Sequence, residues 1–191
     1  VKNKRYLQLV FERSIYYLLA LAIPIGVGIS LLASRIILFF YSAEYANAIL
    51  ALQILIWAEV FVFVNYFIGF LLNSIDKQKL FTITAFIGLG FNVVLNLFLI
   101  PIYGIYGAAA ATLATEILNF VLLYIFSRNN GYSFSVVKTT YKPLVAALIM
   151  AAAIYASRSL HIIVIMPLAA AVYIAALVFL KGVGKEEFDL F

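Results

Sequence analysis

Residues 101–120 read PIYGIYGAAAATLATEILNF, and this stretch contains the features that decide the fold. A proline and two glycines stand within its first seven residues, which predicts a break between two helices. Four consecutive alanines follow, and they leave a smooth surface on which another helix backbone can pack closely. Glu116 then lies among apolar residues, where a charge is costly unless it faces protein or a cavity. The stretch therefore predicts a turn followed by a helix packed inside a membrane bundle.

The overall composition excludes a soluble domain. Hydrophobic residues make up 66% of the 191 residues and charged residues 11%, whereas soluble domains are about 45–50% apolar and about 25% charged. Cysteine is absent from the sequence, which excludes disulfides and cysteine-based metal sites. The net charge of +5 does not indicate nucleic-acid binding, because the basic residues stand singly between apolar runs. We expect the lipid bilayer to be the main partner and expect no cofactor.

The apolar runs predict six membrane-spanning helices, because a hydrocarbon core about 30 Å thick needs roughly 20 apolar residues per helix. Residues 80–115 carry no charge and are too many for one span, so we expect Pro101 and Gly104 to divide them. The fifth span is the shortest, and we expect Pro143 at its start with Lys142 snorkelling to the interface. The fold class is therefore an all-α polytopic transmembrane bundle, with spans at about 14–34, 47–73, 80–100, 105–126, 141–157 and 162–180.

The distribution of Lys and Arg predicts the orientation. Of the thirteen basic residues, eleven fall at the termini or in alternate loops, and the remaining two are Arg35 and Arg158. Because cytoplasmic loops carry the excess of Lys and Arg, both ends of the chain are expected in the cytoplasm and the protein in the cytoplasmic membrane. The chain begins with Val1 and no signal-peptide pattern precedes the first span, so we expect a piece of a longer protein.

Polar residues inside the predicted spans are the candidate functional residues. Glu59 and Glu116 lie near the middle of the second and fourth spans, Asn92 and Asn96 share one face of the third, and Asn119 follows Glu116. One interpretation is a polar cavity with a carboxylate that takes up a proton or binds a cation. The alternative is a neutral glutamate that is hydrogen-bonded in a helix interface. Nothing in the pattern predicts a catalytic or metal-binding cluster.

Small residues on the fourth span predict close helix packing. Gly104, Gly107, Ala111 and Thr115 are spaced for close packing of the fourth span against a neighbour.

A proline and two glycines also cluster in the middle of the first span, at Pro24, Gly26 and Gly28. A proline removes one helical hydrogen bond and kinks the helix. We consider this cluster a candidate hinge, with a passive kink as the alternative.

The order of these motifs resembles a known transporter family. The series runs LALAIPIGVGISLLA (19–33), IILFFYSAEY (36–45), NSIDKQK (73–79), FNVVLNLFLIPIYG (91–104) and GIYGAAAATLATEI (104–117). It is similar to the C-terminal half of flippases for polysaccharides and lipid-linked oligosaccharides, in the multidrug/oligosaccharidyl-lipid/polysaccharide flippase superfamily. The resemblance implies a transporter of two lobes that carries a lipid-pyrophosphate-linked glycan by alternating access. The implied partners are that glycan and the missing N-terminal lobe of the same protein.

Two other functions are compatible with parts of the sequence. Glu59 and Glu116 would suit a drug/cation antiporter of the same superfamily, which needs acidic cavity residues. A membrane-embedded glycosyl- or acyltransferase would need clustered acids or histidines, whereas His161 is the single histidine and the acids are scattered. We therefore expect a protein that is not an enzyme.

The predicted topology can be tested with two cysteines, because the sequence has none of its own. A cysteine at Lys77 and one at Arg158 should react with a membrane-impermeant maleimide from opposite sides of the membrane. The unsubstituted protein is the control and should not react. Labelling of both positions from the same side would contradict the six-span arrangement.

Overall fold

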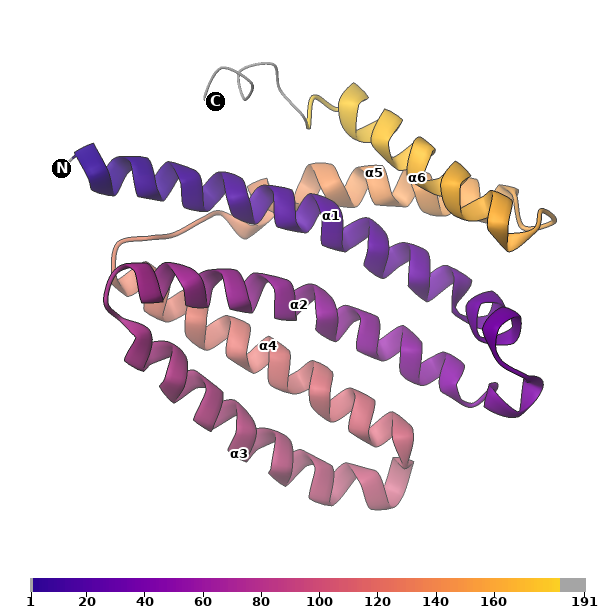
Figure 1. Cartoon of the computed structure of the whole chain (residues 1–191), viewed down its shortest axis with the longest axis horizontal. Helices are drawn as coiled ribbons and strands as arrows, with labels where there is room; N and C mark the ends of the chain where they lie inside the picture. Colours follow the sequence, from indigo (N-terminus) through magenta and orange to yellow (C-terminus); the bar gives the residue numbers. More distant parts are fainter. Residues whose placement is uncertain (1, 183–191) are drawn as a thin grey trace.

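The computed structural model describes residues 2–182, and their regular structure is helical. Six long helices are joined by short connections, with one 3-10 turn after the first (Figure 1). Each long helix is long and apolar enough to cross a membrane. The elements are α1 (Lys2–Phe40), η1 (Ala43–Tyr45), α2 (Ala48–Ser74), α3 (Gln78–Tyr103), α4 (Ile105–Asn129), α5 (Val136–Ala156) and α6 (Ile162–Phe179).

Helix α1 joins two groups of helices. On one side α2, α3 and α4 form a three-helix group in which α4 packs against both α2 and α3; on the other side α5 and α6 form a hairpin (Figure 1). Helix α1 packs on α2 and on α5, so the spatial order is α3, α4, α2, α1, α5, α6. The two groups therefore pack together mainly through α1, which contacts α2 with one face and α5 with another.

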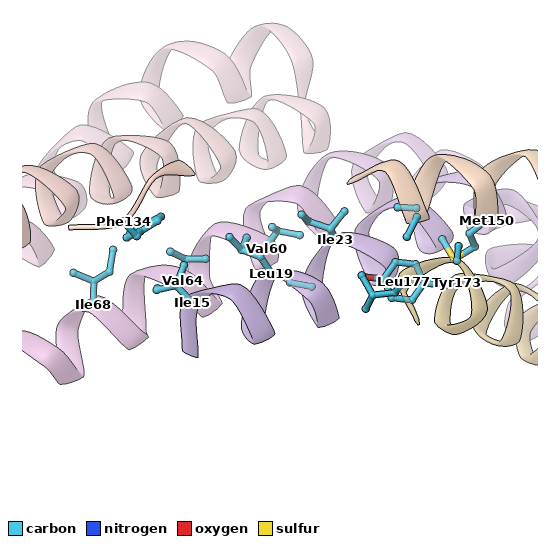
Figure 2. Close-up of a cluster of buried hydrophobic side chains, with 14 of the residues drawn as sticks. Ile15, Leu19, Ile23, Val60, Val64, Ile68, Phe134, Met150, Tyr173 and Leu177 are labelled. Atoms are coloured by element: carbon cyan, nitrogen blue, oxygen red, sulfur yellow. The ribbon is translucent and has the colours of Figure 1, made fainter. Parts of the chain in front are cut away.

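Buried aliphatic side chains form the contact between α1 and α2. Ile15, Leu19 and Ile23 repeat every fourth residue on α1, and Val60, Val64 and Ile68 repeat in the same way on α2. Figure 2 shows the two rows along this contact, with Met150, Tyr173 and Leu177 farther along α1 where the α5–α6 hairpin packs. Rows of this spacing interdigitate when helices pack ridge into groove. One apolar core thus continues through both groups.

Several helix ends differ from the prediction. Helices α2, α4 and α6 lie close to the predicted spans, whereas α1 extends past residues 14–34 at both ends. Its N-terminal extension contains lysine, arginine, glutamine and glutamate, which are good helix formers although they are not apolar. The apolar run therefore predicted the expected membrane segment of α1 but not the turns that extend the helix beyond it.

The predicted role of Pro101 was wrong in part. Helix α3 continues through Pro101 to Tyr103, and the chain reverses at Gly104, whose φ is +56°. Glycine adopts a positive φ without the steric cost that a side chain would bring. The turn therefore depends on Gly104, and Pro101 is accommodated in the last turn of α3.

The predicted start of the fifth span was also wrong. Helix α5 begins at Val136, and Pro143 is buried inside it. The N-cap is Ser135, whose Oγ accepts a hydrogen bond from the backbone N–H of Lys138 at 3.4 Å. Lys138, Thr139, Thr140 and Lys142 make the first two turns of α5 too polar to be found by counting apolar residues, but these turns make the helix long enough to span a bilayer.

Polar contacts connect the helix ends at both ends of the bundle. Gln8 Nε2 donates to the carbonyl of Ser133 at 2.5 Å, and Lys142 Nζ donates to the carbonyl of Lys181 at 2.7 Å. At the opposite end Arg35 donates to the carbonyls of Leu160 (3.1 Å) and Arg158. The two arginines that the sequence placed on one side of the membrane thus lie at the same end of the bundle.

The candidate hinge lies within a continuous helix. Pro24 has no N–H, so the carbonyl of Ala20 has no helical donor. The hydroxyl of Tyr173 in α6 donates to this carbonyl at 2.5 Å. A Cβ at Gly26 would lie 3.2 Å from Val60 of α2, and one at Gly28 would lie 3.8 Å from Met150 of α5. The two glycines face different helices, α2 and α5. The Ala20 carbonyl, which Pro24 leaves without a helical donor, is bonded by α6.

Replacing Tyr173 with phenylalanine should destabilise the protein that carries this chain by about 0.6–1.7 kcal/mol, the range of hydrogen bonds between membrane helices. The cost should fall when Pro24 is also replaced by alanine, because alanine restores an N–H for the Ala20 carbonyl. Thermal unfolding in detergent measures both values. Tyr103→Phe, at an exposed position of α3, is the matched control. An equal cost with and without Pro24 would contradict the assignment.

Candidate functional site

The three-helix group forms a partly polar cavity that is half open to its surroundings. Its volume is about 190 Å³, and residues of α2, α3 and α4 line it. The lining residues are Val62, Asn65, Tyr66, Phe81, Thr84, Ala85, Glu116, Asn119 and Leu123. Glu116 and Asn119 are among the residues that the sequence predicted for a cavity between these spans. A partly buried glutamate thus lies beside two asparagine amides between apolar helices.

Asn65 positions Glu116. Its side chain is only 5% exposed, and its Nδ2 donates to the backbone carbonyl of Glu116 at 3.0 Å and to Glu116 Oε2 at 2.8 Å. One amide therefore connects α2 to both the backbone and the side chain of α4. The sequence analysis missed this pairing, because residues 51 positions apart become partners only once α2 and α4 are known to pack together.

Asn119 forms another wall of the cavity. It lies against Gly88 of α3 so closely that a Cβ on this glycine would overlap Asn119 Oδ1. The absence of a side chain at Gly88 therefore makes room for the amide. Within residues 2–182, Oδ1 of Asn119 and Oδ1 of Asn65 are both buried and have no hydrogen-bond donor. Two amide oxygens at the cavity thus have unused acceptor capacity.

Asn92 and Asn96 belong to a separate polar cluster. Asn96 Nδ2 donates to Asn92 Oδ1 at 2.8 Å, and Asn92 Nδ2 donates to Thr115 Oγ1 at 3.0 Å. The hydroxyl of Thr115 in turn donates to the carbonyl of Ala111 at 2.7 Å. This chain of hydrogen bonds joins α3 to α4. The structure therefore divides the predicted polar residues between two neighbouring clusters.

Glu59 lies outside the lining of the cavity. It is exposed on α2, on the same helical face as the exposed Phe63, Tyr66 and Phe70. Tyr66 also lines the cavity, so this face runs past its edge. The structure thus separates the two glutamates that the sequence presented as equivalent candidates.

The small residues of α4 have two different roles. A Cβ at Gly107 would overlap the carbonyl of Leu99, so this glycine allows α3 and α4 to approach closely. Ala111 and Thr115 are buried on the same face. A Cβ at Gly104 would meet no described atom within 4 Å, and the role of this glycine is the turn before α4 rather than the predicted helix packing.

The chemistry that the cavity offers follows from its atoms. Among the described residues no group of three or more His, Cys, Asp or Glu comes together. The lining groups that can bind a ligand are one carboxylate, two amides and the hydroxyls of Thr84 and Tyr66. Thr84 Oγ1 donates to the carbonyl of Leu80 at 3.0 Å and keeps its lone pairs available. The cavity therefore offers mainly oxygen acceptors.

Comparisons with known proteins identify the family. No protein-family model matches the chain. The lipid II flippase MurJ of Bacillus subtilis is 32% identical over 160 residues, which cover 80% of this chain and 29% of the relative. The flippase Agl15 of Haloferax volcanii, described as probable and as acting in low-salt glycan biosynthesis, is 27% identical over 83% of this chain and 34% of the relative. The chain belongs to the multidrug/oligosaccharidyl-lipid/polysaccharide flippase superfamily.

A third relative shares the sequence similarity, and a solved structure shares the fold. An uncharacterised membrane protein of Methanocaldococcus jannaschii, MJ1068, is 32% identical over 64% of this chain and 24% of the relative. The inward closed conformation of the lipid II flippase MurJ has the same fold, with a TM-score of 0.83 and 21% identity over 95% of this chain and 41% of that structure. The chain therefore spans about a quarter to a third of the length of these curated relatives. The all-α, multi-pass membrane fold is confirmed.

Substitutions of two glycines on α3 test the geometry of the cavity. Gly88→Ala should destabilise the protein by about 1–3 kcal/mol, because the new methyl group overlaps the amide of Asn119. Gly90→Ala is the matched control, since nothing lies within 4 Å of its side-chain position. It should leave stability unchanged or raise it by about 0.5–1 kcal/mol. Thermal unfolding of the two variants measures the difference, and equal stabilities would contradict the close contact between Asn119 and α3.

Proposed function

We propose that this chain is part of one lobe of a flippase that moves a lipid-linked oligosaccharide or polysaccharide precursor across the cytoplasmic membrane. The observation that carries the proposal is sequence similarity to two flippases over 80% and 83% of the chain. The shared fold with MurJ is consistent with it. Movement of an intact lipid-linked glycan breaks no covalent bond, so the protein is a transporter and not an enzyme.

We infer that the rest of the transporter supplies a second lobe and the cationic residues that a pyrophosphate needs. The relatives are three to four times as long as the matched part, which supports a second, N-terminal lobe as partner. Apart from Lys142 at the start of the predicted fifth span, the basic residues of the described helices lie outside the predicted membrane spans, as at Arg13, Arg35 and Arg128. A pyrophosphate at mid-membrane would need cationic partners, and we assign these to the other lobe. Both ends of this chain then lie in the cytoplasm, as the distribution of Lys and Arg predicts.

Alternating access requires movement between packed helices, and α1 is suited to transmit it. The helix contacts both groups, and Pro24 interrupts its hydrogen bonds near the point where α2, α5 and α6 approach it. Bending at Pro24, Gly26 and Gly28 would change the angle between the α2–α4 group and the α5–α6 hairpin. We propose this segment as the hinge and Glu116 as the residue that couples transport to an ion.

The function can be tested in a strain depleted of its own flippase. The full-length protein should restore export of the lipid-linked glycan, and Glu116→Gln should reduce export by roughly tenfold, as expected for the loss of a coupling free energy of 1–3 kcal/mol. Glu44→Gln is the matched control, because Glu44 is an exposed residue of η1.

The same experiment separates the proposal from an antiporter. If the full-length protein left the glycan unmoved and instead exported cationic dyes, the flippase function would be refuted in favour of a drug/cation antiporter.

A further inference from the structure

The exposed residues in the membrane-spanning part of α2 form a single stripe. Helix α2 packs against α1, α3 and α4 (Figure 1). Between positions 51 and 73 the residues that these contacts leave exposed recur every three or four positions, which places them on one face of the helix. This α2 stripe consists of Leu55, Glu59, Phe63, Tyr66, Phe70 and Asn73.

Glu59 places a carboxylate on this stripe at mid-membrane. It lies two residues, or about 3 Å, from Phe61 at the midpoint of α2. Of the three charged residues in the predicted membrane spans, Glu59 is exposed, whereas Glu116 and Lys142 are partly buried. Half of the hydrocarbon core is about 15 Å thick, so the short side chain of a glutamate does not reach the membrane surface from this depth. No residue between 2 and 182 hydrogen-bonds to the carboxylate of Glu59 or forms an ion pair with it.

We propose that the α2 stripe is an interface with the part of the full-length transporter that lies outside this chain, and that Glu59 forms an ion pair there with a lysine or arginine. Ionisable residues within membrane spans face protein or a water-filled cavity, and they pair with one another. This chain spans only 24–34% of the length of its relatives, which supports the presence of further protein to cover the stripe. The inference rests on the proposed function for the existence of that further protein.

Lipid fits other exposed faces of the bundle better than it fits the α2 stripe. Helix α6, at the end of the spatial order, exposes Ile163, Ile174 and Val178 and carries no charge from Ile162 to Phe179. Hydrocarbon accepts such a face without cost. A carboxylate that faced hydrocarbon at mid-membrane would be costly, so the position of Glu59 favours a protein contact over lipid.

A second copy of this chain is also a poor partner. Two copies that are inserted in the same orientation place identical residues at the same depth. A symmetric contact through the α2 stripe would therefore bring two Glu59 side chains toward each other, and like charges repel strongly where the dielectric constant is low. A cationic side chain instead neutralises the carboxylate. Glu59 also lies at the depth of the cationic residues that the proposed function assigns to the other lobe.

Photo-crosslinking identifies what covers the stripe. The photoreactive residue p-benzoylphenylalanine is placed at Phe63, the stripe residue one turn from Glu59, in the full-length protein in its own membrane. Irradiation should link position 63 to a peptide of the same polypeptide that lies outside residues 1–191 and contains a lysine or arginine, as mass spectrometry determines. The matched control is the same substitution at Ile174, an exposed residue of α6, where we expect no link to protein.

Charge reversal then tests the ion pair. Glu59→Lys should lower the yield of the link from position 63 by more than about tenfold, because juxtaposed like charges repel the two surfaces. Replacing the identified lysine or arginine with glutamate should have the same effect, and the two reversals together should restore the link. This restoration separates a broken ion pair from a loss of folding, since two disruptive substitutions would not correct each other. Glu44→Lys, at an exposed residue of η1, is the control and should leave the yield unchanged.

Three results would overturn the interface. The first is a probe at position 63 that reacts with lipid alone, and the second is a link between two copies of the protein. The third is a pair of reversals that fails to restore the link. A link with the expected charge dependence in a protein that exports no glycan would support the interface and refute the proposed transport alone. Export of the glycan without any such link would refute the interface alone.

Discussion

Polar groups inside a bilayer have no water to bond to, and the interior of this bundle is arranged around that constraint. Helices satisfy most of the backbone within each span. Where a proline removes a donor, as at Pro24, the carbonyl that it frees is met by Tyr173 from the last helix. Some polar side chains pair across helices, as Asn65 does with Glu116. Tertiary packing thus follows in part from the need to pair a few groups that the helices cannot satisfy themselves.

Helix α4 brings together the small residues and the polar ones. Gly107 allows the backbone of α3 to approach closely. Along the same pair of helices Asn92 bonds to Thr115, and Asn119 packs against Gly88. The small residue at position 107 thus lets α3 and α4 come close enough for polar contacts between them.

The sequence predicted the class and order of the helices because hydropathy and charge are local properties. It missed the true start of α5, since lysines and threonines interrupt the apolar pattern between Ser135 and Pro143. It placed the reversal at Pro101 as well as at Gly104, although a proline can stand in the last turn of a helix. The pairing of Asn65 with Glu116 could not be found in this way. It depends on which helices are neighbours, and periodicity within one helix does not carry that information.

The bond between Tyr173 and Ala20 also bears on how the protein is made. The two residues are separated by 153 positions, and a ribosome adds about 5–20 residues per second. Roughly 8–30 s therefore pass between the synthesis of the first helix and that of its donor in the last. During that time the nascent first helix carries an unpaired carbonyl at the level of Pro24, which favours its retention beside the insertion machinery, or beside water, until the final hairpin arrives.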